Sequence, residues 1–174
     1  MGAERNYMKY NPEVHHRKSI RLKDYGYSKE GLYFITICTK NRECILSEIV
    51  GADAHICPVS KMTDIGMIVE KYLKNINTSY ENVNLMKYVV MPNHVHFIIN
   101  IEEKSMEKGS MWASTPTVSK IVQTFKIIVT KTLGYSIWQR NYYEHIIRND
   151  RSLNQIIEYI QYNPLNWKND CNYR

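Results

Sequence analysis

Two histidines, His94 and His96, flank a single hydrophobic residue at the start of the apolar segment 94–101. If this segment is a strand, both side chains point to the same face, because strand side chains alternate with period two. Two neighbouring imidazoles can bind a divalent metal, and such a metal can polarise a phosphate. A His-x-His pair alone is a weak signal, since two ordinary packed histidines give the same pattern. A metal site therefore needs support from elsewhere in the chain.

The segment 158–164 carries further groups suited to phosphate chemistry. Tyr159 and Asn163 are four residues apart, so they share one face if the segment is helical. A tyrosine hydroxyl can attack phosphorus and form a covalent phosphotyrosine, but its free pKa of about 10 means that it needs a nearby cation or base. Asn163 could complete the metal shell through its amide oxygen. Taken singly, Tyr159 is better explained as a packing residue, and Asn163 as a helix C-cap before proline.

Tyr162 is a rival nucleophile on the same segment. It lies about 300° around a helix from Tyr159, at roughly 100° per residue. Only one of the two hydroxyls can therefore face the histidines.

The composition indicates a folded, basic protein. The 174 residues are 44% hydrophobic, with a formal net charge of +6. This balance argues against disorder and favours a polyanionic partner such as nucleic acid. The 14 tyrosines add to this expectation, because aromatic rings stack on unpaired bases.

The cysteines show no CxxC spacing, so neither a zinc knuckle nor a redox motif is indicated. No signal peptide is visible, and no apolar run is long enough to span a bilayer. These features predict a reduced cytoplasmic protein that is not associated with a membrane.

Basic residues offer candidate phosphate contacts in three parts of the chain. Residues 1–20 read as a basic N-terminal arm, which is either solvated or bound to DNA. Lys120 and Lys126 lie on an expected helix with an apolar face, where lysines are solvated by default. In segment 138–148, Tyr142 and Tyr143 either stack on bases or fill the core. The candidate DNA-binding residues are Arg17, Lys18, Arg21, Lys120, Lys126, Arg140 and Arg148.

Hydrophobic periodicity and turn signals predict an α+β fold in a single domain, 21–174. Strands are expected at 32–39, 83–90, 94–101 and 142–147. Helices are expected from Thr63 or Asp64 to about residue 77, from Pro116 or Thr117, and from Asp150 or Ser152 to Pro164, with a loop at 102–114. The order β-α-β-β-α-β matches a ferredoxin-like antiparallel sheet, to which a C-terminal helix carrying Tyr159 is added.

Three motifs occur in a fixed order: Met-Pro-Asn-His-Val-His at 91–96, Trp-Gln-Arg-Asn-Tyr-Tyr-Glu-His-Ile-Ile-Arg at 138–148, and Glu-Tyr-Ile-Gln-Tyr-Asn-Pro at 158–164. Together with segments 21–25 and 33–39, they resemble the REP-associated tyrosine transposases. These are relatives of the single-tyrosine insertion-sequence transposases. The resemblance covers nearly the whole chain, so it is far more specific than the histidine pair alone.

The resemblance implies an HUH endonuclease, named for its His-hydrophobic-His pair. Such an enzyme cuts single-stranded DNA, often at the foot of a hairpin, and leaves a 5′-phosphotyrosine and a free 3′-hydroxyl. By position, His94 and His96 would bind Mg²⁺ or Mn²⁺, and Tyr159 would be the nucleophile. Asn163 stands where the insertion-sequence enzymes place a metal-binding glutamine. The resemblance leaves both a homodimer and a monomer open.

Two alternatives are weaker. A non-catalytic nucleic-acid-binding module on the same sheet explains the charge and the tyrosines. It gives no reason, however, for His94, His96 and Tyr159 to occur together. The second alternative is a different histidine phosphoesterase. A histidine-triad hydrolase needs a third alternating histidine, but this chain has Ile98 at that position. A two-histidine phosphoesterase needs a second His-x-Thr/Ser motif, and none is evident in the sequence.

Overall fold

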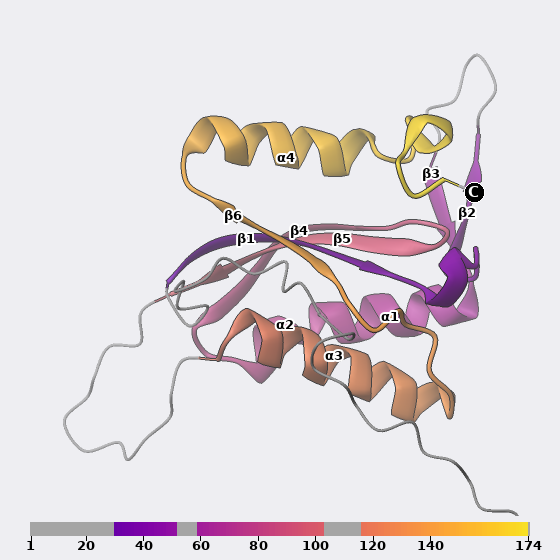
Figure 1. Ribbon diagram of the computed structural model, residues 1–174, viewed down its shortest axis with the longest axis horizontal. Coiled ribbons are helices and arrows are strands. Elements are labelled where there is room, and N and C mark those ends of the chain that lie inside the picture. Colours follow the sequence, from indigo (N-terminus) through magenta and orange to yellow (C-terminus); the bar gives the residue numbers. More distant parts are fainter. Residues whose placement is uncertain (1–29, 52–58, 103–115, 174) are drawn as a thin grey trace, which may run out of the picture.

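A four-stranded antiparallel sheet forms the centre of the protein (Figure 1). The computed structural model describes residues 30–51, 59–102 and 116–173. The expected arm 1–20 and the boundary after it lie outside these residues, as do Arg17, Lys18 and Arg21. The strand order is β4-β5-β1-β6, and the strands are β1 (Gly31–Cys38), β4 (Val83–Val90), β5 (His94–Ile101) and β6 (Tyr143–Ile147). This order confirms the expected ferredoxin-like α+β fold.

The register of the strands places three residues in one row across the sheet. The central strand β1 pairs with β5 on one side and with β6 on the other. Thr36 of β1 is opposite His96 in one pairing and opposite Tyr143 in the other. Residues directly opposite each other point to the same face. His96, Thr36 and Tyr143 therefore share the face that carries the candidate chemistry.

Three helices cover the other face: α1 (Asp64–Lys74), α2 (Ile76–Ser79) and α3 (Val118–Leu133) (Figure 1). The hydroxyls of Thr63 and Thr117 accept hydrogen bonds from the first-turn amides of α1 and α3. They are therefore the N-caps. The sequence predicted one helix to about residue 77. Instead α1 stops at Lys74, because the amide of Asn75 bonds within the last turn and a short second helix begins.

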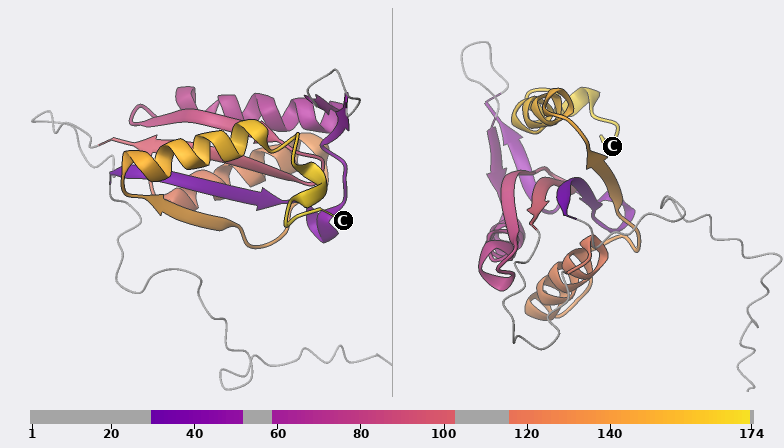
Figure 2. Two further views of the ribbon diagram at one scale, coloured as in Figure 1. Left: turned by 90° about the horizontal axis from the view of Figure 1, so that it is seen from above. Right: turned by 90° about the vertical axis from the view of Figure 1, so that its left-hand side faces the viewer.

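Helix α4 (Asp150–Tyr162) lies on the opposite face of the sheet from α1, α2 and α3 (Figure 2). Its N-cap is Asn149, whose side chain accepts from the amide of Ser152, rather than the expected Asp150 or Ser152. Ile160 packs against Phe34 and other apolar residues of this face. The sheet is thus buried on both sides, and α4 forms a separate layer over the histidine pair.

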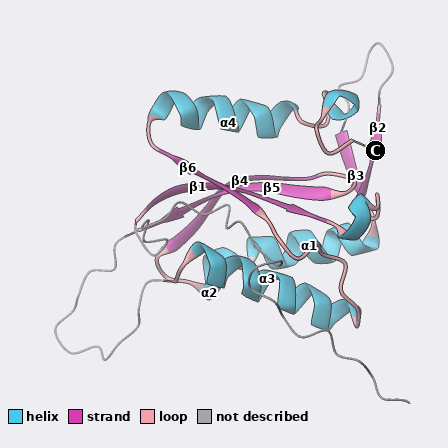
Figure 3. Cartoon of the chain, in the orientation of Figure 1, coloured by secondary structure: helices cyan, strands magenta, loops and turns pink. Residues whose placement is uncertain are grey.

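A second, two-stranded sheet was not expected from the sequence. It consists of β2 (Ser47–Val50) and β3 (Val59–Met62) (Figure 3). Both strands are short, and the residue that they bury is the polar Ser47, so they lack the hydrophobic pattern that reveals a strand. The hydroxyls of Ser47 and Ser60 donate to the carbonyl of Val90 and attach this sheet to the end of β4. The described residues also include two 3-10 turns, η1 (Lys40–Arg42) and η2 (Trp167–Asn169).

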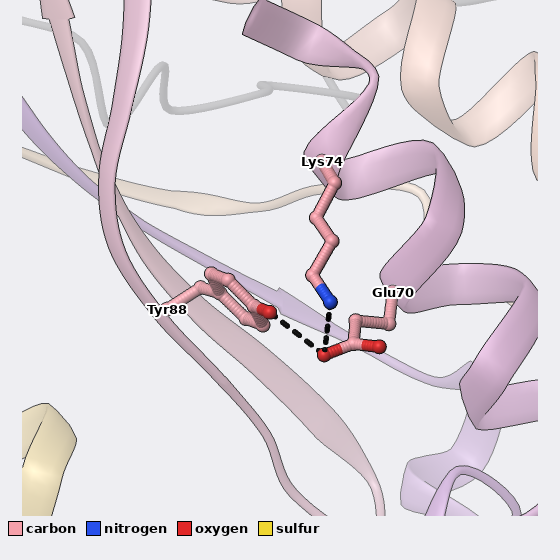
Figure 4. A network of polar contacts seen from close by, with 3 residues as sticks. All are labelled: Glu70, Lys74 and Tyr88. Carbon is pink, nitrogen blue, oxygen red and sulfur yellow. Dashed lines mark hydrogen bonds and ion pairs between the residues drawn. The ribbon is translucent and has the colours of Figure 1, made fainter.

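Two contacts fix α1 in place. Gly66 lies so close to the chain before β2 that a Cβ atom there would clash with the carbonyl oxygen of Leu46. On the same helix, the Glu70 carboxylate accepts from the hydroxyl of Tyr88 at 2.7 Å and from the ammonium of Lys74 at 3.0 Å (Figure 4). The second contact joins α1 to β4 across the interface of helix and sheet.

Among the described residues, no helix is long and apolar enough to cross a membrane.

Candidate active site

His94 and His96 lie side by side under α4. Both belong to β5, and their rings are 4.3 Å apart between centroids. His94 is fully buried and His96 is 2% exposed. The strand period predicted this shared face, and the structure places it on the side of the sheet that α4 covers.

Asn93 sets the tautomer of His94. The Asn93 amide nitrogen donates to two backbone carbonyls, those of Arg42 and Asn172. Its amide oxygen therefore turns toward Nδ1 of His94, 2.8 Å away. An amide oxygen only accepts, so Nδ1 carries the proton and Nε2 keeps its lone pair. Nε2 of His94 is buried and has no hydrogen-bond partner among the described residues.

Thr36 holds His96 from across the sheet. Its hydroxyl oxygen lies 2.7 Å from Nδ1 of His96. A hydroxyl can donate or accept, so this contact suits either tautomer of the ring. Phe34 stacks on the same imidazole at 5.3 Å between centroids and fixes its plane.

Both histidines are neutral near pH 7. Burial lowers the pKa of His94 to about 4, and Arg42 adds to this effect while Asp170 opposes it. Burial, with a contribution from His94, also holds the pKa of His96 well below its usual value. Neutral imidazoles are the form that ligates metals.

Tyr159 brings its hydroxyl to the histidine pair. Its oxygen lies 3.2 Å from Nε2 of His96, and the hydroxyl donates to Oδ2 of Asp170 at 3.0 Å. Burial and the Asp170 carboxylate raise the pKa of this phenol well above its usual range. Tyr162, the rival nucleophile, is 50% exposed and takes no part in this cluster of described side chains.

Asn163 completes the cluster from the C-cap position of α4. Its amide nitrogen donates to Oδ2 of Asp170 at 3.0 Å. Its amide oxygen is buried and, like Nε2 of His94, has no partner among the described residues. Asn163 therefore occupies the expected C-cap position, while its side chain is a neighbour of the catalytic candidates.

Asp170 is the site residue that sequence reasoning missed. It comes from the turn after η2 and is a lone acid with no spacing that marks it. Burial alone would raise its pKa, but hydrogen bonds from the Asn172 amide, Asn163 and Tyr159 outweigh burial and lower it. The turn is held in place from outside, because a guanidinium nitrogen of Arg42 donates to the carbonyl of Cys171 at 2.9 Å.

The donor atoms fit a divalent metal. One ligand atom from each of His94, His96 and Asp170 lies within 4.8 Å of the others. His94 Nε2 and the amide oxygen of Asn163 are buried and have no hydrogen-bond partner within the described part of the chain, as expected of atoms that bind a ligand. Imidazole nitrogens with carboxylate and amide oxygens suit Mn²⁺ well and Mg²⁺ through the oxygens.

The predicted DNA contacts are dispersed over the fold. Lys120 is exposed on α3, on the face of the sheet opposite the site. Arg140 and Arg148 are exposed before and after β6. Lys126 instead directs its ammonium at the carbonyls of Gln139, Arg140 and Asn141, at 2.9, 3.4 and 3.1 Å. These bonds give Lys126 a structural role, and its contact with DNA stays a prediction.

The chain is similar to known DNA-processing proteins. The profile of a family described as "Transposase IS200 like" matches residues 28–163. An uncharacterized protein of Haemophilus influenzae is 40% identical over 95% of this chain and 97% of its own length. The REP-associated tyrosine transposase of Escherichia coli is 26% identical over 80% of this chain and 69% of its own length. A solved structure of a REP-associated tyrosine transposase bound to a REP hairpin aligns with a TM-score of 0.60 at 21% identity, over 85% of this chain and 74% of that one.

Proposed function

Because this chain belongs to the IS200-like transposase family, we propose that it cleaves and rejoins single-stranded DNA in a metal-dependent reaction through a 5′-phosphotyrosine at Tyr159. The family membership supports DNA processing as the general activity. The metal, the nucleophile and the covalent intermediate are the content of the proposal.

The observation that carries the proposal is the approach of Tyr159 to His96, 3.2 Å between Oη and Nε2. The proposed nucleophile and a proposed metal ligand, 63 residues apart in the sequence, thus lie in contact. The chain has 14 tyrosines, and packing alone does not explain why Tyr159 in particular contacts the histidine pair.

His94 and His96 would hold the cation, with Asp170 or Asn163 supplying an oxygen ligand. Bound there, Mg²⁺ or Mn²⁺ would polarise the scissile phosphate and offset the negative charge that develops in the transition state. Asn93 and Thr36 keep the two imidazoles in place for this task.

The chain's own residues position the hydroxyl and offer an acceptor for its proton. Oη of Tyr159 forms a bond to phosphorus, and the bond from phosphorus to the 3′-oxygen breaks. The phenol proton leaves toward Asp170, the carboxylate to which it already donates. The departing 3′-oxygen takes up a proton from solvent. A 3′-hydroxyl attacking the phosphotyrosine reverses these changes and rejoins a strand.

Hairpin-forming DNA is the substrate class that we propose. The net charge of +6 suits a polyanion. The structural neighbour with a TM-score of 0.60 is described as bound to a REP hairpin. The binding of hairpins is taken from that neighbour as part of the proposal.

A trapping experiment tests the proposal. The protein is incubated with Mn²⁺ or Mg²⁺ and a pool of end-labelled single-stranded hairpins whose flanks are randomised, and covalent adducts are resolved on a denaturing gel. Wild type should form a metal-dependent adduct. Tyr159→Phe should form none, while Tyr162→Phe, three residues along the same helix, should form it at nearly the wild-type rate.

Each outcome separates the alternatives. An adduct that persists in Tyr159→Phe and disappears in Tyr162→Phe would assign the nucleophile to Tyr162. Hairpin binding by wild type without an adduct under either metal would favour the non-catalytic nucleic-acid-binding module.

A further inference from the structure

Tyr143 lies beside the site but takes no part in the contacts described so far. It belongs to the edge strand β6, opposite Thr36, which is itself opposite His96. Neighbouring strands are about 4.8 Å apart, so the backbones of Tyr143 and His96 are about 10 Å apart along this row. The Tyr143 side chain is 50% exposed, whereas His96 at the other end is buried.

An unbroken aromatic contact joins Tyr143 to the site. Phe34 meets the Tyr143 ring edge-on at 6.4 Å between centroids. The same Phe34 contacts His96 at 5.3 Å and Tyr159 at 6.1 Å. Phe34 is 8% exposed, whereas Tyr143, at the edge of the sheet, reaches solvent, as Tyr159 does on α4. Because Phe34 supports the ring, little conformational entropy is left to lose when something stacks on it.

The charges around Tyr143 favour a polyanion. Arg140 precedes β6 and Arg148 follows it, both exposed. His145, opposite Phe34, is exposed on the same face. Glu144 points to the opposite face, where its carboxylate accepts from the hydroxyl of Tyr142. No acid of β6 therefore shares the face of Tyr143.

We propose that Tyr143 stacks on a base of the single strand within two nucleotides of the scissile phosphate. The proposal rests on the proposed function, since it takes Tyr159 as the point of cleavage. Aromatic stacking tolerates any base and contributes substantially to affinity for single strands. Tyr143 would thus hold the strand in line with the site without reading its sequence.

A fluorescence experiment tests this contact directly. Hairpins carry 2-aminopurine at one of the two nucleotides on either side of the cleavage position, or of the stem foot if no cleavage is found. Binding is measured with Tyr159→Phe protein, so the DNA stays intact. We expect quenching at one of these positions, because a ring stacks on the fluorescent base. Tyr143→Phe should keep it, and Tyr143→Ala and Tyr143→Leu should lose it.

Affinity is measured in parallel with a matched control. Tyr135→Ala removes another exposed tyrosine, 55% accessible and just after α3, on the other side of the sheet. Loss of one stacked base should weaken binding about tenfold or more in Tyr143→Ala. Tyr135→Ala should change it less than twofold.

Two results would overturn the proposal. One is quenching at no position in any labelled hairpin that binds. The other is equal affinity and equal quenching for Tyr143→Leu and Tyr143→Phe. Fluorescence and affinity both require binding only. The absence of a covalent adduct would therefore contradict the proposed function, while these two measurements would still decide whether Tyr143 stacks on a base.

Discussion

The hydroxyl oxygen of Thr36 lies 2.7 Å from Nδ1 of His96, on the strand next to it. With Nδ1 as acceptor, Nε2 of His96 is protonated and donates to the Tyr159 oxygen, which in turn donates to Asp170. With Nδ1 as donor, Nε2 presents a lone pair to a metal. The same hydroxyl serves both states, so Thr36 permits a change of tautomer without moving the ring.

Replacing Thr36 should therefore weaken metal binding. In Thr36→Val the shape is kept but the hydroxyl is lost, and the ligand tautomer of His96 has no partner. Loss of such an outer contact typically costs about 10–100-fold in metal affinity. Titration of Mn²⁺ followed by electron paramagnetic resonance should show this loss, and Thr36→Ser should restore most of the affinity. A Val variant that binds like wild type would contradict the role of Thr36.

Lys126 should order the segment that leads into β6. Its ammonium donates to three consecutive carbonyls of that segment, at 139–141. Burial lowers the pKa of this amine to about 8, so it is still mostly protonated at pH 7. Lys126→Met should raise amide hydrogen exchange in 139–142 by about tenfold, as expected for losing about 1–3 kcal/mol of local hydrogen bonding. Lys120→Met, an exposed lysine on the same helix, serves as control and should leave that exchange unchanged.

Glu70 should contribute stability that depends on pH. Burial alone would raise its pKa, but hydrogen bonds from Tyr88 and Lys74 outweigh burial and lower it below 4.5 (Figure 4). A carboxyl with a lowered folded-state pKa stabilises the fold at pH values above its unfolded-state pKa. This stabilisation is lost as the pH falls through the folded-state pKa. The melting temperatures of wild type and Glu70→Gln should therefore differ at pH 6 and converge as the pH falls through the folded-state pKa of Glu70. Glu48→Gln, on exposed β2, should show no such divergence.

Gly66 should tolerate no side chain. An added Cβ would meet a backbone carbonyl oxygen, that of Leu46, which cannot rotate away. Overpacking of this kind costs about 1–3 kcal/mol or more. Urea unfolding of Gly66→Ala should show that loss. Gly134→Ala tests backbone strain alone, because Gly134 has φ of +79° and open space around it, and it should cost about 1 kcal/mol.

The period of a strand and the spacing of residues along a helix were sufficient to predict part of the site. Alternation placed His94 and His96 on one face, and the four-residue spacing placed Tyr159 and Asn163 on one side of α4. Both are local properties of a strand and a helix. That these two faces meet is a property of how α4 crosses the sheet. Local periodicity does not specify such a crossing.

The remaining site residues depend on tertiary pairing. Thr36 holds His96 only because β1 and β5 align in one particular register. Asp170 reaches the cluster through a turn fastened by Asn93 and Arg42, and neither contact leaves a pattern in the sequence. Lys126 was expected at a phosphate for its charge, whereas its neighbours in space are carbonyls. The sheet of β2 and β3 is not predictable from the sequence, because its strands lack a buried apolar face.

The pairing of Thr36 with His96 joins residues 60 positions apart, and the contact of Tyr159 with His96 joins residues 63 apart. Loops of that length close late and slowly when a chain folds, since their entropy cost must be met before the contacts form. The imidazole of His96 is thus held in place only when the central strands have come together. In a refolding experiment, high-affinity binding of Mn²⁺ should develop with the slowest phase of sheet formation, which makes the metal a reporter of completed folding.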